Sequence, residues 1–155
     1  MLLAAFFAAL HYLTLAVGFG AVFARGLRLR DLRRSPSNDA VLSRLFRADA
    51  VWGIAALFWL GTGLVRAFAG LEKSPGFYLR NGFFWLKMAL FLAVLGLELF
   101  PMLTFIRWRA ARASGAPAVA ADRLGVLVRL NDLEVALIVA IPFIASLMAR
   151  GTWLF

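Results

Sequence analysis

Cysteine is absent from this sequence, and histidine occurs only once, at His11. The absence of cysteine excludes disulfide bonds, thiolate metal sites and cysteine nucleophiles. A single histidine excludes a metal site built from several histidines of one chain, and also a haem held by two histidines of one protomer. The sequence has no phosphate-binding glycine loop, zinc-ligand spacing or nucleophile elbow, so it gives no support to the common soluble enzyme classes.

Charged residues are also few, at 16% of the 155 residues, whereas 63% are hydrophobic and the mean hydropathy is +0.85. A chain of this composition cannot cover one hydrophobic core with a polar surface, so its solvent is lipid. Long segments with almost no charge alternate with short segments rich in arginine. This alternation is typical of multi-pass membrane proteins.

Four apolar segments are long enough to cross the hydrocarbon core of a bilayer, since about 20 helical residues at about 1.5 Å each suffice. These spans are expected at residues 2–24, 48–69, 82–106 and 126–149. Between the first two we expect a basic connection that ends in a short surface helix over residues 39–47. The sequence shows no inverted internal repeat. We therefore predict an all-α fold, in which residues 1–155 form a single domain of four transmembrane helices.

The distribution of basic residues predicts how the bundle is oriented. Of the seventeen, seven lie between the first and second spans, two between the second and third, and four between the third and fourth. Because lysine and arginine are enriched in inside loops, both termini are expected outside, in the bacterial inner membrane. The expected partners of the basic residues are anionic lipid headgroups rather than nucleic acid. A homodimer is compatible with a bundle of this size but is not specified by the sequence.

Ionisable side chains within membrane spans are costly, so each is a candidate for a functional site. Arg66 and Lys87 belong to the outer half of the membrane and suit an anionic ligand group, because arginine offers a fork and lysine a point charge. The inner half is expected to contain a buried charged network suited to protons, a divalent cation or neighbouring arginines. Its expected members are Asp49, Glu98, Asp132 and Glu134.

Helical spacing indicates which side chains face the bundle. Asp49, Trp59 and Arg66 belong to one stripe of the second span, spaced by alternating steps of three and four residues. Trp59 is then either a packing residue or a surface on which a cofactor stacks. Lys87 and Glu98 share a face of the third span.

Two of these residues have a simpler interpretation. Lys87 lies close enough to the membrane boundary to extend toward the headgroups. Glu98 is close enough to the inside arginines to pair with one of them, such as Arg47 or Arg129. Neither interpretation requires a ligand.

His11 lies within the first span, and Thr14, Gly18, Ala21 and Arg25 follow it at bundle-facing spacing. A lone histidine is either a hydrogen-bonded core residue or a metal ligand. Imidazole is a standard axial ligand of haem iron, and the neighbouring small residues leave space for a flat macrocycle. In that alternative, Arg66 and Lys87 would neutralise the propionates of a haem or related tetrapyrrole.

Two stretches carry a resemblance to a known family: WGIAALFWLGTGLVR at residues 52–66 and LEKSPGFYLRNGFFWLKMALF at residues 71–91. Together with residues 11–25 and the ELFPM segment at residues 98–102, they resemble the bacterial family of predicted membrane proteins labelled domain of unknown function 2214. The resemblance covers most of the chain. The family label implies a membrane protein and names no activity.

Four spans with a histidine in the first and Trp-Leu-Lys at the start of the third are also similar, more distantly, to HemJ-type protoporphyrinogen oxidases and CopD-like membrane proteins. The HemJ resemblance implies a haem b held through His11, with Lys87 matching the lysine of the third helix. That family has a histidine at the end of the third helix, where this sequence has Glu98 and Pro101. Because this histidine is missing, the resemblance supports the four-helix fold more than it supports the oxidase activity.

Three functions are left open by the sequence, which indicates no catalytic residue. The first is a protein that binds haem or a related tetrapyrrole. The second is a small proton-coupled transporter in which Glu98 acts with Asp132 or Glu134. The third is a structural or accessory membrane subunit whose buried charges only fix the register of the helices.

Overall fold

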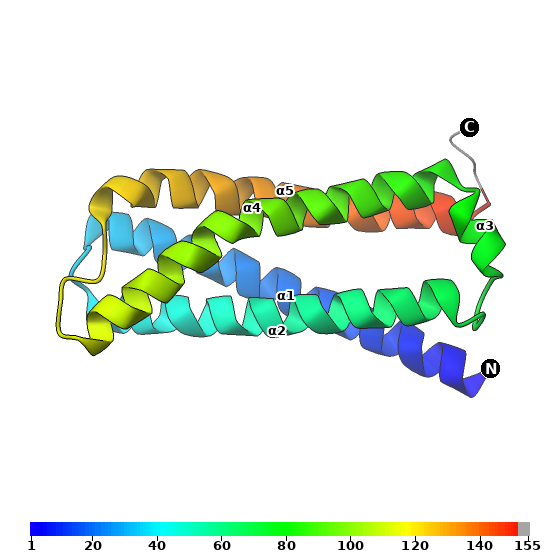
Figure 1. The fold of residues 1–155 in the computed structure, drawn as a ribbon, viewed down its shortest axis with the longest axis horizontal. Coiled ribbons are helices and arrows are strands. Elements are labelled where there is room, and N and C mark those ends of the chain that lie inside the picture. Colours follow the sequence, from blue (N-terminus) through cyan, green and yellow to red (C-terminus); the bar gives the residue numbers. More distant parts are fainter. Residues whose placement is uncertain (152–155) are drawn as a thin grey trace.

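The computed structural model describes residues 1–151, which fold into long helices joined by short connections (Figure 1). In chain order the elements are α1 (Leu2–Arg34), α2 (Asp39–Phe68), α3 (Pro75–Leu79), α4 (Gly82–Ala113), the 3-10 helix η1 (Ala121–Arg123) and α5 (Leu124–Ala149). No strand occurs in residues 1–151. Helices α1, α2 and α4, and α5 together with η1, are long and apolar enough to cross a membrane. The predicted all-α, four-helix transmembrane bundle is confirmed.

The four long helices run up and down along one axis (Figure 1). The connections from α1 to α2 and from α4 to α5 lie at one end, here called the loop end. The N-terminus, α3 and the last turn of α5 lie at the other, here called the terminal end. α1 packs mainly on α2, and α5 packs on α4 and α1. Both ends of the described chain therefore lie on the same side of the bundle, as the count of four spans requires.

Helices α1 and α2 are longer than the predicted spans. The predicted basic connection between them is almost entirely helical, and only residues 35–38 join α1 to α2. Arginine is a good helix former, so charge alone does not end a helix where it leaves the hydrocarbon. Pro36 disfavours helical conformation at Ser35, and the Asn38 side chain accepts a hydrogen bond from the Val41 amide to begin α2.

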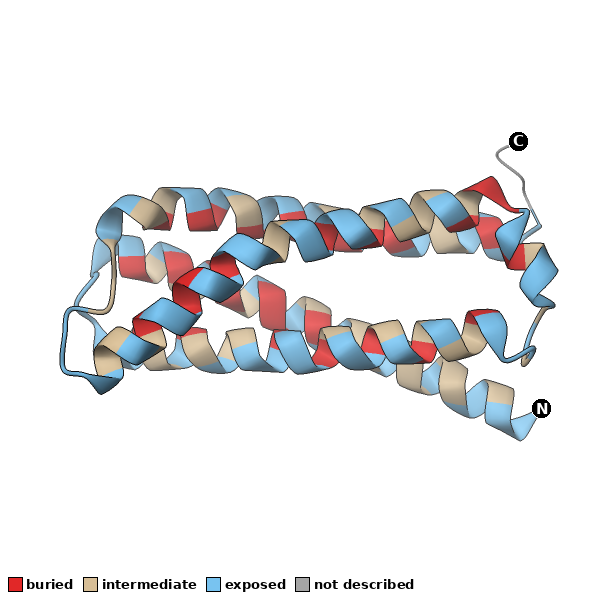
Figure 2. Cartoon of the chain, in the orientation of Figure 1, coloured by how far each residue is buried: buried red, intermediate tan, exposed pale blue. Residues whose placement is uncertain are grey.

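The interior of the bundle is apolar along most of its length. One cluster fills the loop end and includes Leu45, Phe105 and Leu127. A second fills the middle and includes Trp52, Trp59 and Phe91, and a third lies at the terminal end. Figure 2 shows these buried positions turned toward the bundle axis, while the outward faces are exposed. The exposed faces carry many leucines and phenylalanines, as expected of surfaces that lipid covers.

Candidate functional site

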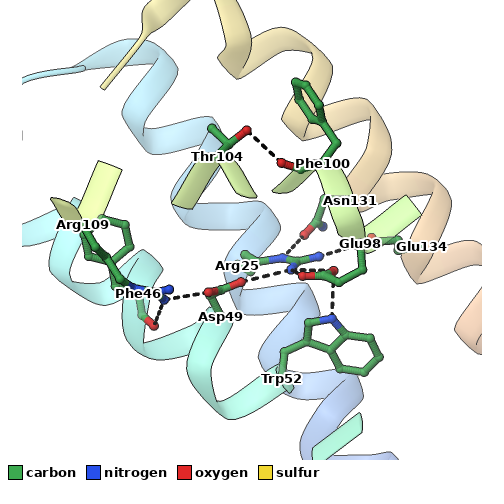
Figure 3. Close-up of polar contacts among 10 residues, drawn as sticks. All are labelled: Arg25, Phe46, Asp49, Trp52, Glu98, Phe100, Thr104, Arg109, Asn131 and Glu134. Atoms are coloured by element: carbon green, nitrogen blue, oxygen red, sulfur yellow. Dashed lines mark hydrogen bonds and ion pairs between the residues drawn. The ribbon is translucent and has the colours of Figure 1, made fainter. Parts of the chain in front are cut away.

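A network of charged side chains lies between the loop-end and middle apolar clusters, centred on Arg25 (Figure 3). We call it the Arg25 cluster. Its members are Arg25 of α1, Asp49 and Trp52 of α2, Glu98 and Arg109 of α4, and Asn131 and Glu134 of α5. All four long helices contribute, so the cluster ties the whole bundle together.

Every nitrogen of the Arg25 guanidinium donates to a partner, and the side chain is 0% exposed. Nε donates to Asn131 Oδ1 at 2.9 Å. Nη1 donates to Glu98 at 2.7 and 2.9 Å and, more weakly, to Asp49 Oδ1 at 3.4 Å. Nη2 donates to Glu134 Oε2. A planar guanidinium offers five donors in a fixed fork, so no other cation could hold these four groups at once.

The position of Arg25 follows from the buried stripe of α1, on which Gly18, Val22, Arg25, Gly26 and Leu29 recur at helical spacing. Gly26 allows α5 to approach closely, because a Cβ at this position would lie 2.5 Å from Asn131 Nδ2. Asn131 can therefore lie against the α1 backbone beside Arg25. The cluster depends on this absence of a side chain.

Two side chains, Trp52 and Arg109, extend the cluster beyond the contacts of Arg25. The Trp52 indole donates to Glu98 Oε2 at 3.0 Å. Arg109 donates to Asp49 Oδ2 at 2.6 Å and to the Phe46 carbonyl at 3.1 Å, and it is 38% exposed. Arg109 lies near the end of α4 and so nearer the loop end than the other members, and the cluster therefore reaches from the buried core toward the surface there.

The structure brings together three of the four carboxylates expected in the buried network, namely Asp49, Glu98 and Glu134. The expectation for Asp132 is wrong. Its side chain is 48% exposed and accepts from Arg30 at 2.5 Å on the surface of the bundle. Asp132 and Glu134 are two residues apart on a helix, which turns their side chains about 200° from each other.

The central role of Arg25 was not predicted from the sequence, because Arg25 directly follows the first predicted span and was assigned to the basic connection. The available signal was its bundle-facing spacing from Gly18 and Ala21. The partner of Glu98 was also wrong: it pairs with Arg25, whereas Arg47 and Arg129 are exposed. Only the arrangement of α1, α4 and α5 in the bundle could identify this pairing.

A second polar feature surrounds His11, closer to the terminal end. Trp59 Nε1 donates to His11 Nε2 at 3.1 Å, and His11 Nδ1 lies 2.9 Å from Thr62 Oγ1. The Thr62 hydroxyl donates to the Phe58 carbonyl at 2.7 Å, so its oxygen accepts from His11 Nδ1. This arrangement corresponds to a neutral imidazole with its proton on Nδ1.

The surroundings of His11 do not fit an axial haem ligand. Iron would need a ring nitrogen with a free lone pair, and Trp59 and Thr62 engage both nitrogens. Trp59 also packs edge-on against Phe91 at 5.5 Å between ring centroids. Trp59 therefore serves as a packing residue and a hydrogen-bond donor.

Beside His11 lies a cavity of about 440 Å³, in the half of the bundle nearer the terminal end. Its walls come from all four long helices and α3, and most of them are apolar or aromatic: Leu60, Phe68, Phe77, Phe84, Met88 and Ile141. Tyr78 also lines it, and burial raises the pKa of its hydroxyl. Tyr78 therefore stays protonated at neutral pH and can donate a hydrogen bond.

Three cations line this cavity, and they differ in their partners. Lys73 donates to the Ala149 carbonyl at 3.4 Å and lies over the Phe77 ring. Arg66 makes a two-point contact with Glu72, at 2.9 and 3.2 Å, and lies over the Tyr12 ring. Lys87 has no carboxylate partner among the described residues, and its ammonium lies 5.2 Å from the centroid of the Phe84 ring. The structure therefore brings together His11, Trp59, Arg66 and Lys87 around one cavity, where Arg66 is paired with Glu72 and Lys87 has no carboxylate partner among the described residues.

Comparison with known proteins gives one match. The sequence matches the family described as "Predicted membrane protein (DUF2214)" over residues 3–152. No curated protein and no solved structure matches the chain. The matched range contains the whole Arg25 cluster and every residue that lines the cavity. Its description names no substrate, cofactor or reaction.

Proposed function

Because the chain belongs to the DUF2214 family of predicted membrane proteins, we propose its function from the cavity: the protein binds a largely apolar molecule that carries one anionic group. The observation that carries this proposal is Lys87, a partly buried cation on the cavity wall with no carboxylate partner among the described residues. A charge removed from water is costly unless an opposite charge accompanies it. An anionic ligand group would supply that charge.

The cavity suits such a ligand in size and lining. Its volume of about 440 Å³ lies within the usual range of small-molecule sites, about 300–1,000 Å³. Aromatic walls favour an acyl chain or a ring system, and Met88 and Met148 adapt to irregular shapes. Glu72 already neutralises Arg66, so the ligand's charge is directed to Lys87 rather than to Arg66.

We also propose where the protein acts. The arginine-rich loop end favours an orientation in the bacterial inner membrane with the loop end in the cytoplasm, so the cavity would lie in the outer half of the membrane. Exposed arginines at the loop end, among them Arg33, Arg44 and Arg47, are proposed contacts for anionic lipid headgroups. A homodimer stays a prediction from the size of the bundle.

Replacing Lys87 with methionine is expected to weaken binding of an anionic probe about tenfold, since one charge-assisted contact is worth about 1.4 kcal/mol or more. The probe is decanoate, titrated into protein in lipid nanodiscs and followed by calorimetry. Decanol, which has the same chain without the charge, should bind wild type more weakly than decanoate. Its affinity should change little in Lys87→Met, because methionine preserves the apolar stem.

The matched control is Arg80→Met, which removes an exposed cation at the same end of the bundle that does not line the cavity. Decanoate should bind this variant as it binds wild type. Equal binding of decanoate and decanol to wild type would contradict the proposal, as would equal losses in the Lys87 and Arg80 variants. Either result would favour a purely structural role for the charges at this end.

A further inference from the structure

The Arg25 cluster is distinct from the cavity, and its charges do not balance. We infer that it is a proton-binding site, in which the carboxyl groups of Glu134 and Glu98 together hold one proton. The inference is independent of the proposed function, since it rests on other residues. Its basis is the charge of the cluster, the burial of Glu134 and the arrangement of the carboxylates around Arg25.

The cluster contains three carboxylates, on Asp49, Glu98 and Glu134, against two guanidinium groups, on Arg25 and Arg109. The nearby Arg30 and Asp132 are exposed and pair with each other, so they add no net charge. With every carboxyl group ionised, the cluster has one negative charge in excess. An uncompensated charge in the interior of a membrane bundle is strongly unfavourable, and one bound proton removes it.

Glu134 is the carboxyl group least able to remain ionised. Its side chain is 0% exposed, its Oε2 accepts from Arg25, and its Oε1 has no hydrogen-bond partner among the described residues. By contrast, Glu98 accepts from Arg25 and Trp52, and Asp49 accepts from both arginines. Adjacent nitrogens of one guanidinium hold Glu134 and Glu98, so the two carboxyl groups lie side by side. The proton is therefore shared between these two groups.

The geometry favours a proton over a metal ion. The three carboxylates surround the positive charge of Arg25 instead of converging on a common point. No set of three metal-binding side chains occurs in the described part of the chain. A cation placed among these oxygens would also be repelled by the guanidinium. A proton needs only one oxygen and no coordination sphere.

The arrangement also indicates with which side of the membrane the proton exchanges. From Glu134 and Arg25, both fully buried, the contacts lead to Asp49 and then to the partly exposed Arg109 near the loop end. In the other direction, the middle apolar cluster with Trp52, Trp59 and Phe91 lies between Arg25 and the cavity. The site therefore exchanges with the loop-end side of the membrane.

Infrared spectroscopy tests the inference on the full chain in nanodiscs at neutral pH. Wild type should show the C=O stretch of a protonated carboxylic acid, and the band should shift in D₂O. Glu134→Gln and Glu98→Gln should each abolish the band, because either change removes the excess negative charge and the remaining carboxyl groups ionise. Asp132→Asn, only two residues from Glu134 but on the surface, should retain it.

Absence of the band from folded wild type at neutral pH would overturn the inference. Its persistence in folded Glu134→Gln, or its loss in Asp132→Asn, would overturn it as well. If the glutamine variants do not fold, the wild-type spectrum decides alone: the band must be present at neutral pH and disappear in a single step as the pH rises. A band that never titrates would also contradict exchange with the loop-end side.

Discussion

Replacing Arg25 with methionine is expected to destabilise the bundle by about 3–5 kcal/mol, because removing one partner leaves buried charges uncompensated. Three carboxylates would then face only Arg109, which contacts Asp49 alone among them. Membrane and soluble domains of this size have little stability to spare, since typical totals are about 5–15 kcal/mol. Unfolding titrations with SDS in mixed micelles, followed by circular dichroism, would measure the loss.

Arg28→Met is the matched control on the same helix. Arg28 pairs with Asp31 at the surface, and such pairs contribute about 0–1 kcal/mol. Arg25→Lys should fall between the two, because lysine keeps the charge but cannot hold Asn131, Glu98 and Glu134 simultaneously. If Arg25→Met unfolds at the same SDS fraction as Arg28→Met, the cluster does not hold the helices together.

Adding a single methyl group at Gly26 is expected to cost about 1–3 kcal/mol, the usual effect of overpacking a tight interior. The new Cβ would lie 2.5 Å from Asn131 Nδ2 and 3.2 Å from Arg30 Nη1. Asn131 is buried and cannot swing into solvent, so it would move away and lose its bond from Arg25 Nε. The same SDS titration applied to Gly26→Ala would measure the effect.

Gly20→Ala is the control, because a Cβ at Gly20 meets nothing within 4 Å on the same helix. It should leave the stability unchanged or raise it by up to about 1 kcal/mol through the better helix propensity of alanine. A double-mutant cycle tests whether the clash with Asn131 causes the loss of stability. If the clash with Asn131 is the cause, Asn131→Ala should cost much less in the Gly26→Ala background than in wild type. If the costs of the two substitutions in the free energy of unfolding are additive, the clash with Asn131 is not the cause.

The transmembrane helices could be predicted because hydrophobic length and charge segregation are properties of the sequence alone. The ends of α1 and α2 could not, since the arginines after Arg25 favour helix as well as they favour an inside loop. The first helix-breaking residue is Pro36, two residues after α1 ends at Arg34. Helix breakers, rather than charges, would have given better boundaries.

The candidate site residues also divide into those whose positions could be predicted from the sequence and those whose positions could not. Arg66 and Lys87 were placed together correctly because helical spacing and depth both follow from sequence position. The pairing of Arg25 with Glu98 and Glu134 joins residues 73 and 109 positions apart, and it depends on how α1, α4 and α5 are arranged in the bundle. His11 was left between two interpretations for the same reason, since Thr62 and Trp59 reach it from another helix.

Helix α1 is unbroken from Leu2 to Arg34 and carries residues of both sites. His11, on the cavity wall, and Arg25, in the charged cluster, are about 21 Å apart along this helix at about 1.5 Å per residue. Because a continuous helix tilts as one rod, a change of its angle at the cavity is also a displacement at the cluster. A ligand in the cavity and a proton in the cluster, as proposed above, would therefore both act on the same helix, without a relay of side chains between them.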